Sequence, residues 1–299
     1  MDRLHLMTVF AAVAEAESFA GGARKLGMSP PAVTRAIAAL EQRLRVKLLT
    51  RTTRYVRATD AGLRYLAHAK RIIADADEAD EAAAGAHAVP RGHFAVTAPV
   101  LFGRLYVMPG IVEYLKRFPE VSVSALFLDR VVNLIEEGMD VGVRIGELPD
   151  SSMHAIDVGH VRRVVCASPA YLKKHGAPRT PADLAQHSII AASPVTPTIE
   201  WKFVKDKKTL GVKVNPRLTV TNNESAIVAA TAGFGVTRLL SYQIAQQLAD
   251  GQLKAVLVDY EPARLPIHLL HREGRQASAK VRTFVDLLAE TLRKDKALR

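Results

Sequence analysis

A run of small and hydrogen-bonding side chains begins at Ser29, and these residue types could contact the base edges and phosphates of a nucleic acid. The run comprises Ser29, Pro30, Pro31, Ala32, Thr34 and Arg35. Small residues let a helix backbone approach a DNA groove, Thr34 can bond a base edge or contact a thymine methyl, and Arg35 can pair with guanine or a phosphate. A helical hairpin with an unremarkable polar face fits the same spacing, and this alternative stays open.

Two short helices joined by a glycine turn would position these residues. Ser18 is expected to cap the first helix, Gly27 gives the turn its backbone freedom, and Ser29 is expected to cap the second helix, with Pro30 in its first turn. Apolar residues at spacings of four, three and four face inward: Val33, Ile37, Leu40 and Leu44. An earlier helix is expected to pack under the pair through Leu4, Leu6, Met7, Phe10 and Val13. This arrangement is typical of a helix-turn-helix whose second helix reads DNA from its N-terminal end.

A basic segment without helical periodicity follows at residues 47–57, and it predicts a small β-hairpin, or wing. Its Arg51, Thr52, Thr53 and Arg54 suit contacts with phosphate oxygens or a narrow minor groove. Residues 1–60 hold ten basic side chains against five acidic ones, which favours a nucleic-acid partner. Ordinary solvated surface charge is the alternative.

The stretch from Ser29 to Gly62 closely resembles the DNA-binding end of the LysR-type transcriptional regulators. The residues that carry the resemblance are Ser29, Pro31, Thr34-Arg35, Leu40-Glu41, Arg51 and Thr59 to Gly62. Two features depart from the family pattern: Arg45 stands where the family usually has Gly, and Gly21-Gly22 replace the usual helix formers. A helix-interior Gly costs roughly 0.5–1 kcal/mol relative to Ala, so the first helix of the pair is expected to be softer than in relatives. The resemblance extends more loosely over nearly the whole chain.

An Ala-rich stretch over residues 59–86 predicts one long helix. Its apolar positions alternate spacings of four and three: Tyr65, Ala69, Ile72, Ala76, Ala79, Ala83 and Ala86. About 27 residues would span ~40 Å, a length suited to pairing with a second copy, although a single exposed linker is the alternative. The resemblance implies that two subunits join through this helix as a homodimer, and that further contacts give a homotetramer.

Beyond Gly92 strand-like and helical runs alternate, which favours mainly parallel α/β sheets. One strand is expected over 161–167 and one helix over 131–137. The resemblance implies a periplasmic-binding-protein-like (type 2) domain of two lobes, with crossovers near 160–164 and 264–268. We therefore expect a multidomain protein with an all-α winged helix-turn-helix at residues 1–58, a linker helix at 59–88 and an effector-binding domain at 89–299. Its first lobe would hold about 89–162 and 267–299, and its second lobe about 163–266.

A small-molecule effector would bind between the lobes, where strands end and helix N-termini present N–H groups to anions. The candidate residues are Thr97, Ala98, Pro99, Val100, Phe102, Arg144, Gly146, Thr221, Asn222 and Asn223. Thr97 and Asn223 could instead be helix caps, Pro99 a turn residue, and Arg144 a member of a surface ion pair. Residues 91–299 hold 28 basic and 20 acidic side chains, which would attract an anionic effector. Five of these lysines cluster in an expected surface hairpin at 202–213, where solubility is the simpler explanation.

Other chemistries find little support in the sequence. Cys166 is the single cysteine, so no disulfide can form within the chain, and the ten histidines show no metal-ligand spacing. No cofactor, metal site or enzymatic activity is expected. No signal peptide or membrane helix is evident, which predicts a cytoplasmic protein without membrane contact. Two rival functions remain: a solute-binding or enzymatic protein whose helix pair does not bind DNA, and an architectural DNA binder with a ligand-blind second domain.

Overall fold

The computed structural model describes residues 2–51, 56–84, 89–148, 153–192, 199–271 and 277–299. The chain forms two compact units, an N-terminal unit (Met1–Ala88) and a C-terminal unit (Val89–Arg299). Each unit has its own hydrophobic core.

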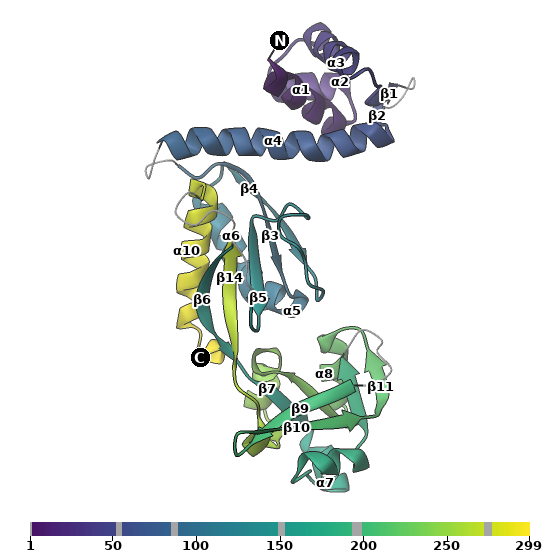
Figure 1. Ribbon diagram of the computed structural model, residues 1–299, viewed down its shortest axis with the longest axis vertical. Coiled ribbons are helices and arrows are strands. Elements are labelled where there is room, and N and C mark those ends of the chain that lie inside the picture. The colour runs from purple at the N-terminus through teal and green to yellow at the C-terminus, as the bar shows by residue number, and fades with distance from the viewer. Residues whose placement is uncertain (1, 52–55, 85–88, 149–152, 193–198, 272–276) are drawn as a thin grey trace. The chain divides into compact units, whose positions relative to one another are not determined.

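The N-terminal unit contains three helices, a two-stranded wing and a long helix (Figure 1). Its elements are α1 (Arg3–Ala16), α2 (Phe19–Leu26), α3 (Pro30–Leu44), β1 (Leu49–Arg51), β2 (Val56–Ala58) and α4 (Asp60–Ala84). The two strands pair antiparallel, and apolar side chains of all three short helices meet in one core. Six of these core residues are fully buried: Val9, Phe10, Val13, Val33, Ala36 and Leu40. The prediction of a winged helix-turn-helix is confirmed, with the wing formed by two β-strands.

Small residues set the spacing of α1, α2 and α3. The Ser18 hydroxyl accepts a hydrogen bond from the Gly21 N–H at 3.2 Å and so caps α2, while Gly27 ends α2 in the left-handed region at φ +62°. A Cβ on Gly22 would lie 2.7 Å from Val13 Cγ2, which is closer than real Cβ contacts come. The lack of a side chain at Gly22 therefore allows α2 to pack closely on α1. This packing offsets the poor helix propensity of glycine.

Two expectations for this unit are wrong in part. Ser29 occupies the N-cap position of α3, but its side chain makes no capping hydrogen bond. The predicted pairing seam of α4 begins too early, because the Tyr65 ring packs edge-on against Phe10 at 5.6 Å and Ala69 is fully buried. These two residues belong to the core side of the N-terminal unit, since the first turns of α4 pack against α1.

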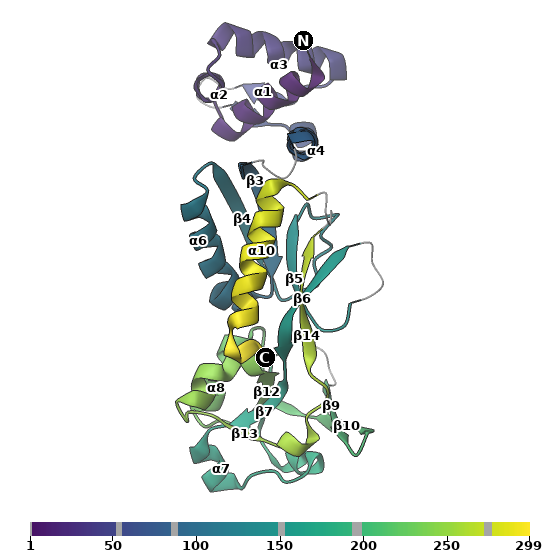
Figure 2. The ribbon, with the colours of Figure 1, turned by 90° about the vertical axis from the view of Figure 1, so that its left-hand side faces the viewer.

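The C-terminal unit contains two five-stranded sheets with helices packed on them (Figure 2). The first sheet has the order β4-β3-β5-β14-β6, and the second has the order β11-β8-β12-β7-β13. The elements up to the first crossover are β3 (Gly92–Ala98), α5 (Val100–Phe102), the π-helical turn η2 (Gly103–Val107), α6 (Met108–Arg117), β4 (Val121–Phe127), β5 (Val141–Ile145) and β6 (His154–Val161). The elements of the second sheet and its coverings are β7 (Arg163–Ala167), α7 (Pro169–His175), η3 (Pro181–Gln186), β8 (Ile189–Ala192), β9 (Ile199–Lys205), β10 (Lys208–Val214), β11 (Pro216–Val220), α8 (Asn223–Thr231), β12 (Val236–Leu240), η4 (Ser241–Ile244), α9 (Ala245–Ala249), β13 (Lys254–Val256) and η5 (Val258–Tyr260). The chain then returns to the first sheet through β14 (Leu265–His271), α10 (Ala279–Lys294) and η7 (Lys296–Leu298).

Both sheets are mixed, so the expectation of mainly parallel sheets is wrong. In the first sheet β3 pairs parallel with β4 and β5, whereas β14 pairs antiparallel with β5 and β6. In the second sheet β8 pairs parallel with β11 and β12, whereas β7 pairs antiparallel with β12 and β13. The antiparallel strands β7 and β14 are those that the chain enters from the other sheet, between Val161 and Arg163 and again before Leu265. We call the part built on each sheet the first and the second lobe.

Two local expectations for the first lobe are also wrong. Residues 131–137 form no helix: residues 131–133 have no regular structure, and residues 134–138 form hydrogen-bonded turns. The Asn133 side chain accepts hydrogen bonds from the Ile135 and Glu136 N–H groups, and the Glu137 carboxylate binds Arg130 and the Asn133 N–H. Such local side-chain bonds compete with helix formation. The single strand expected over 161–167 is two strands, β6 and β7, which belong to different sheets.

Candidate nucleic-acid interface and effector site

The candidate DNA-reading residues lie at the N-terminal end of α3, on the side away from the core. Ser29, Pro30, Pro31 and Arg35 are exposed, and Ala32 and Thr34 are partly exposed. Farther along the same face, Ala38 and Gln42 are exposed as well. The residues expected to face inward do so, with Val33, Ile37 and Leu40 buried and Leu44 partly buried. The structure thus brings the six helix candidates together on one accessible surface.

The wing is fixed to α3 by the buried carboxylate of Glu41, whose side chain is only 9% exposed. Its Oε1 accepts hydrogen bonds from the backbone N–H groups of Leu48 at 3.0 Å and Leu49 at 3.1 Å. Its Oε2 lies 2.6 Å from the Lys47 Nζ. Burial raises the pKa of Glu41, but the bonds from Lys47, Leu49 and Leu48 outweigh it, and the net pKa is lowered. A charged Glu41 therefore holds the first strand of the wing against the recognition helix.

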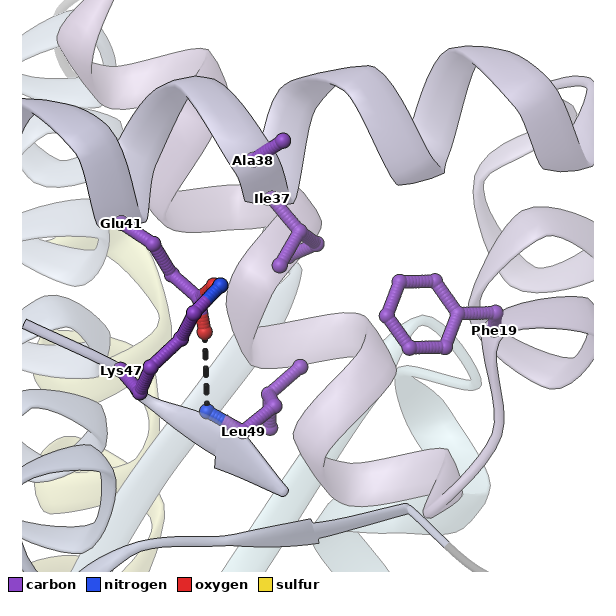
Figure 3. A pocket seen from close by; sticks show the side chains of 6 residues that line it. All are labelled: Phe19, Ile37, Ala38, Glu41, Lys47 and Leu49. Atoms are coloured by element: carbon purple, nitrogen blue, oxygen red, sulfur yellow. Dashed lines mark hydrogen bonds and ion pairs between the residues drawn. The ribbon is translucent and has the colours of Figure 1, made fainter. Parts of the chain in front are cut away.

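Figure 3 shows Glu41 beside a small pocket between α2, α3 and β1, with a hydrogen bond drawn to Leu49. The pocket has a volume of about 270 Å³. It is lined by Phe19, Ile37, Ala38, Glu41, Lys47 and Leu49. Sequence reasoning noted Glu41 as part of a motif but missed its role, because its partners are backbone groups that no side-chain pattern reveals.

Thr59 and Gly62 form a second tie between the wing and the rest of the unit. The Thr59 hydroxyl donates to the Lys47 carbonyl at 2.8 Å and accepts from the Gly62 N–H at 2.9 Å. A Cβ on Gly62 would lie 2.0 Å from the Leu48 carbonyl oxygen. This contact gives the physical reason for a threonine and a glycine three residues apart at the start of α4. Of the wing candidates, Arg51 ends β1, while Thr52, Thr53 and Arg54 lie outside the described residues.

The candidate effector residues of the first lobe surround the end of β3. Thr97 and Ala98 are fully buried strand residues, so Thr97 is not a helix cap. Pro99 precedes α5, Val100 is partly exposed, and Phe102 is fully buried. The Thr97 Oγ1 is buried and has no hydrogen-bond partner among the residues that the structure describes. A buried hydroxyl without a partner is costly, which makes this atom a candidate contact for a ligand.

Two helix starts expected to offer N–H groups to an anion are partly occupied from within the chain. The Val100 N–H donates to Asp129 Oδ1 at 3.0 Å, and the Ser225 N–H donates to Asn222 Oδ1 at 2.8 Å. Asn222, and not Asn223, is therefore the cap of α8. Thr221 and Asn222 are exposed, and Asn223 is partly exposed.

Arg144 and Gly146 lie where β5 meets the returning strand β14. The Arg144 guanidinium donates to the Val132 carbonyl and, at 3.4 Å, to the carbonyl of its neighbour Val143, so it anchors the segment that leads into the turns at 134–138. Burial lowers the pKa of Arg144, and Glu137 opposes that change. Gly146 adopts φ +116° and donates to the Pro266 carbonyl at 2.9 Å. The expected surface ion pair of Arg144 is not among the ion pairs of the described residues.

Contacts between the lobes bring the candidates of α5 and α8 into one region. Arg104 Nη1 lies 2.6 Å from Glu224 Oε1, which joins η2 of the first lobe to the first turn of α8 in the second. The Tyr242 ring lies 5.3 Å from Phe102 and 6.0 Å from Tyr106. Burial raises the pKa of Tyr106 to about 12, so its hydroxyl stays protonated. Sequence reasoning missed Arg104, Tyr106, Glu224 and Tyr242, which belong to no local motif.

A winged helix-turn-helix and a two-lobed α/β domain on one chain define a class of DNA-binding proteins that respond to small molecules. Comparison with known protein families supports this class for both the N-terminal and the C-terminal part of the chain. The family described as "Bacterial regulatory helix-turn-helix protein, lysR family" matches residues 4–63, and "LysR substrate binding domain" matches residues 87–293.

Relatives match over almost the entire chain. A probable HTH-type transcriptional regulator, LtrA of Klebsiella pneumoniae, is 30% identical over 96% of this chain and 94% of its own length. The HTH-type transcriptional regulator CrgA of Neisseria meningitidis serogroup B is 30% identical over 96% of each chain. A solved structure of CrgA from Neisseria meningitidis has a TM-score of 0.61 at 29% identity, with 96% of this chain and 98% of that chain covered. The full-length Vibrio cholerae virulence activator AphB has the same fold, with a TM-score of 0.62 at 24% identity, 97% of this chain and 99% of that chain being covered.

The chain belongs to the LysR-type transcriptional regulators, DNA-binding proteins with an effector-binding domain. Regulators of this type bind DNA and small-molecule effectors and are oligomeric. In the part of the chain that the structure describes, no helix combines the length and apolar character needed to cross a membrane.

Proposed function

We propose that this regulator reads DNA with the N-terminal end of α3, grips the phosphate backbone with its wing, and changes its DNA contacts when a small molecule binds between the two lobes. In this proposal the DNA-binding residues are those predicted from the sequence: Ser29, Pro30, Pro31, Ala32, Thr34, Arg35, Arg51, Thr52, Thr53 and Arg54. Residues 1–58 form the DNA-binding domain, residues 59–88 the linker helix, and residues 89–299 the effector domain. The protein acts in the cytoplasm and carries no catalytic site.

The observation that carries the DNA-binding part is the exposed, hydrogen-bonding surface of α3. The Ser29 side chain makes no capping hydrogen bond to α3, and Arg35 is exposed without an ion pair to any described residue. Both side chains are therefore available to a base edge or a phosphate.

Fluorescence anisotropy with duplex DNA from upstream of the gene tests this proposal. We expect Arg35→Ala to weaken specific binding by about 1–3 kcal/mol and to relax preference at one base position. Lys213→Ala, an exposed lysine on β10, is the matched control and should bind as wild type does. An unchanged base preference in Arg35→Ala would remove the reading role of that residue.

The linker helix α4 is proposed to pair two copies of the chain. Its 25 residues span about 38 Å, and Leu63 and Ile72 are 57% and 41% exposed. Since Tyr65 and Ala69 are used within the N-terminal unit, the pairing seam would run from Ile72 toward the end of the helix. Sedimentation analysis of the full chain should give a dimer or a tetramer, and a monomer at micromolar concentration would refute this part.

The effector is proposed to bind beside the unpartnered Thr97 hydroxyl at the end of β3. The remaining contacts would come from the other residues predicted for this site: Ala98, Pro99, Val100, Phe102, Arg144, Gly146, Thr221, Asn222 and Asn223. A ligand donor or acceptor would satisfy the buried Thr97 hydroxyl. Thermal melting against a panel of small carboxylates and aromatic compounds tests this. A true effector should raise the melting temperature of the wild type, and Thr97→Val should lose most of that rise.

A further inference from the structure

Two arginines of the second lobe share one face of the sheet on neighbouring strands. Arg163 begins β7, and Arg238 lies in the middle of β12. In the antiparallel register Arg238 is opposite Val165, and Leu240 is opposite Arg163. Side chains two residues apart on a strand point to the same face, so Arg163 and Arg238 are diagonal neighbours on that face.

Strands β9 and β10 pair antiparallel as a separate hairpin, and this hairpin covers the face that carries the two arginines. Val165 and Val236 lie in one buried cluster with Trp201 and Phe203 of β9. The Arg238 guanidinium carbon lies 5.0 Å from the centre of the Trp201 ring, and its Nη1 donates to the Lys202 carbonyl at 3.3 Å. Leu239 points to the opposite face, into the cluster that contains Ala226 and Ile227 of α8. The arginine pair is therefore separate from the effector candidates at the start of α8.

Neither arginine has a carboxylate partner among the described residues. No ion pair within 4.0 Å joins Arg163 or Arg238 to an acidic side chain there, whereas the adjacent Arg162 pairs with Glu261 at 2.9 Å. The connection from β8 to β9, residues 193–198, contains no Asp or Glu in its sequence. Burial lowers the pKa of both arginines, and Arg163 helps to lower that of Arg238, to about 10. Two neighbouring, partly buried cations are thus left without an opposing charge, which is unfavourable.

We propose that Arg163 and Arg238 form a binding site for a small oxyanion, in addition to the effector site between the lobes. The guanidinium group presents paired N–H donors that match the oxygens of a carboxylate or a phosphate. An anion between them would cancel their repulsion and supply the missing acceptors. Arg163 directly follows the crossover from the first lobe, so occupancy would also restrain β7 at the point where the lobes hinge.

Thermal melting of the full chain at constant ionic strength tests the site, with chloride replaced by inorganic phosphate in one series and by benzoate in another. We expect at least one anion to raise the wild-type melting temperature by roughly 5 °C at saturation. The rise should vanish in Arg163→Gln and in Arg238→Gln. It should persist in Arg217→Gln, a matched control on β11 whose guanidinium bonds the Ser188 hydroxyl.

A second measurement shows whether Arg163→Gln loses the rise in melting temperature only because the variant folds poorly. In chloride alone, Arg163→Gln should melt at or above the wild-type temperature, because it removes one of two mutually repelling charges. A rise that survives in Arg163→Gln, or the lack of any rise with both anions in the wild type, would overturn the proposal. A rise lost in Thr97→Val but kept in Arg163→Gln would place the anion in the effector site and would leave the proposed function intact.

Discussion

Replacing Glu41 by Ala should detach the wing from the recognition helix and weaken DNA binding. The variant leaves the backbone N–H groups of Leu48 and Leu49 without their acceptor. Each unsatisfied buried donor costs about 1–3 kcal/mol, and water entering the neighbouring pocket would reduce that cost, so we expect a loss of about 2–4 kcal/mol in the stability of the wing contact. Hydrogen exchange at Leu48 and Leu49 should accelerate accordingly, and DNA affinity should fall with it.

Two matched variants separate the contributions to this effect. Glu41→Gln keeps an oxygen for both N–H groups and loses only the ion pair with Lys47, which is 79% exposed. Exposed pairs contribute about 0–1 kcal/mol, so Glu41→Gln and Lys47→Ala should both stay close to wild type. The reasoning is wrong if Glu41→Gln loses as much DNA affinity as Glu41→Ala, or if exchange at Leu48 and Leu49 is unchanged in Glu41→Ala.

The protonation of Glu41 gives the same contact a pH dependence. Because its pKa is lowered in the folded state, its charge contributes stability above the unfolded value of about 4.5, and that contribution is lost as pH falls through the folded pKa. Wild type should therefore lose stability in this acidic range relative to Glu41→Gln. A constant difference between the two proteins from pH 7 to pH 3 would contradict this assignment.

Three further predictions concern the backbone and the single thiol. Arg45 ends α3 at φ +53°, so Arg45→Gly should relieve strain and stabilise the N-terminal unit by up to about 1 kcal/mol, measured by calorimetry; a lower melting temperature would count against it. Gly62→Ala should destabilise the unit by several kcal/mol and abolish DNA binding, because its Cβ would collide with the Leu48 carbonyl, whereas Gly27→Asn, in open space, should be tolerated. Cys166 is fully buried and burial raises its pKa to about 12, so it should resist thiol reagents at pH 7 until the protein unfolds; rapid labelling of the native chain would contradict this.

The sequence could predict those features that depend on local pattern. The three- and four-residue spacing of Val33, Ile37 and Leu40 fixed which face of α3 is buried, and Gly27 marked the turn before it. These succeed because helix period and left-handed backbone are properties of a few consecutive residues. The Arg45 departure also became interpretable, since a family glycine at that position implies a positive φ, which Arg45 adopts.

Long-range contacts account for most of what the sequence could not reveal. Asp129, 29 residues away in the sequence, accepts a hydrogen bond from the Val100 N–H. One of the N–H groups that the sequence suggested was free to bind an anion is therefore already bonded. The segment at 131–137 has a helix-like composition, but hydrogen bonds from Arg144 and to Asn133 hold it in another conformation. In each case a polar side chain forms a hydrogen bond with a backbone group that a helix or an anion would otherwise use. Which side chain lies close enough to do so is seen only in the folded structure.

The contacts between the lobes indicate where an effector would have to act. The Arg104–Glu224 pair is conspicuous, but its side chains are 61% and 42% exposed, so it contributes at most about 1 kcal/mol to closure. Tyr242 is only 2% exposed and packs against Phe102, and it follows Ser241, whose N–H and hydroxyl bond the Arg162 backbone at the crossover. Any rotation of the lobes about that crossover must move Tyr242 relative to Phe102. An effector can shift lobe closure only if its affinity differs between the two arrangements, and this buried aromatic contact, unlike the exposed ion pair, is where such a difference can arise.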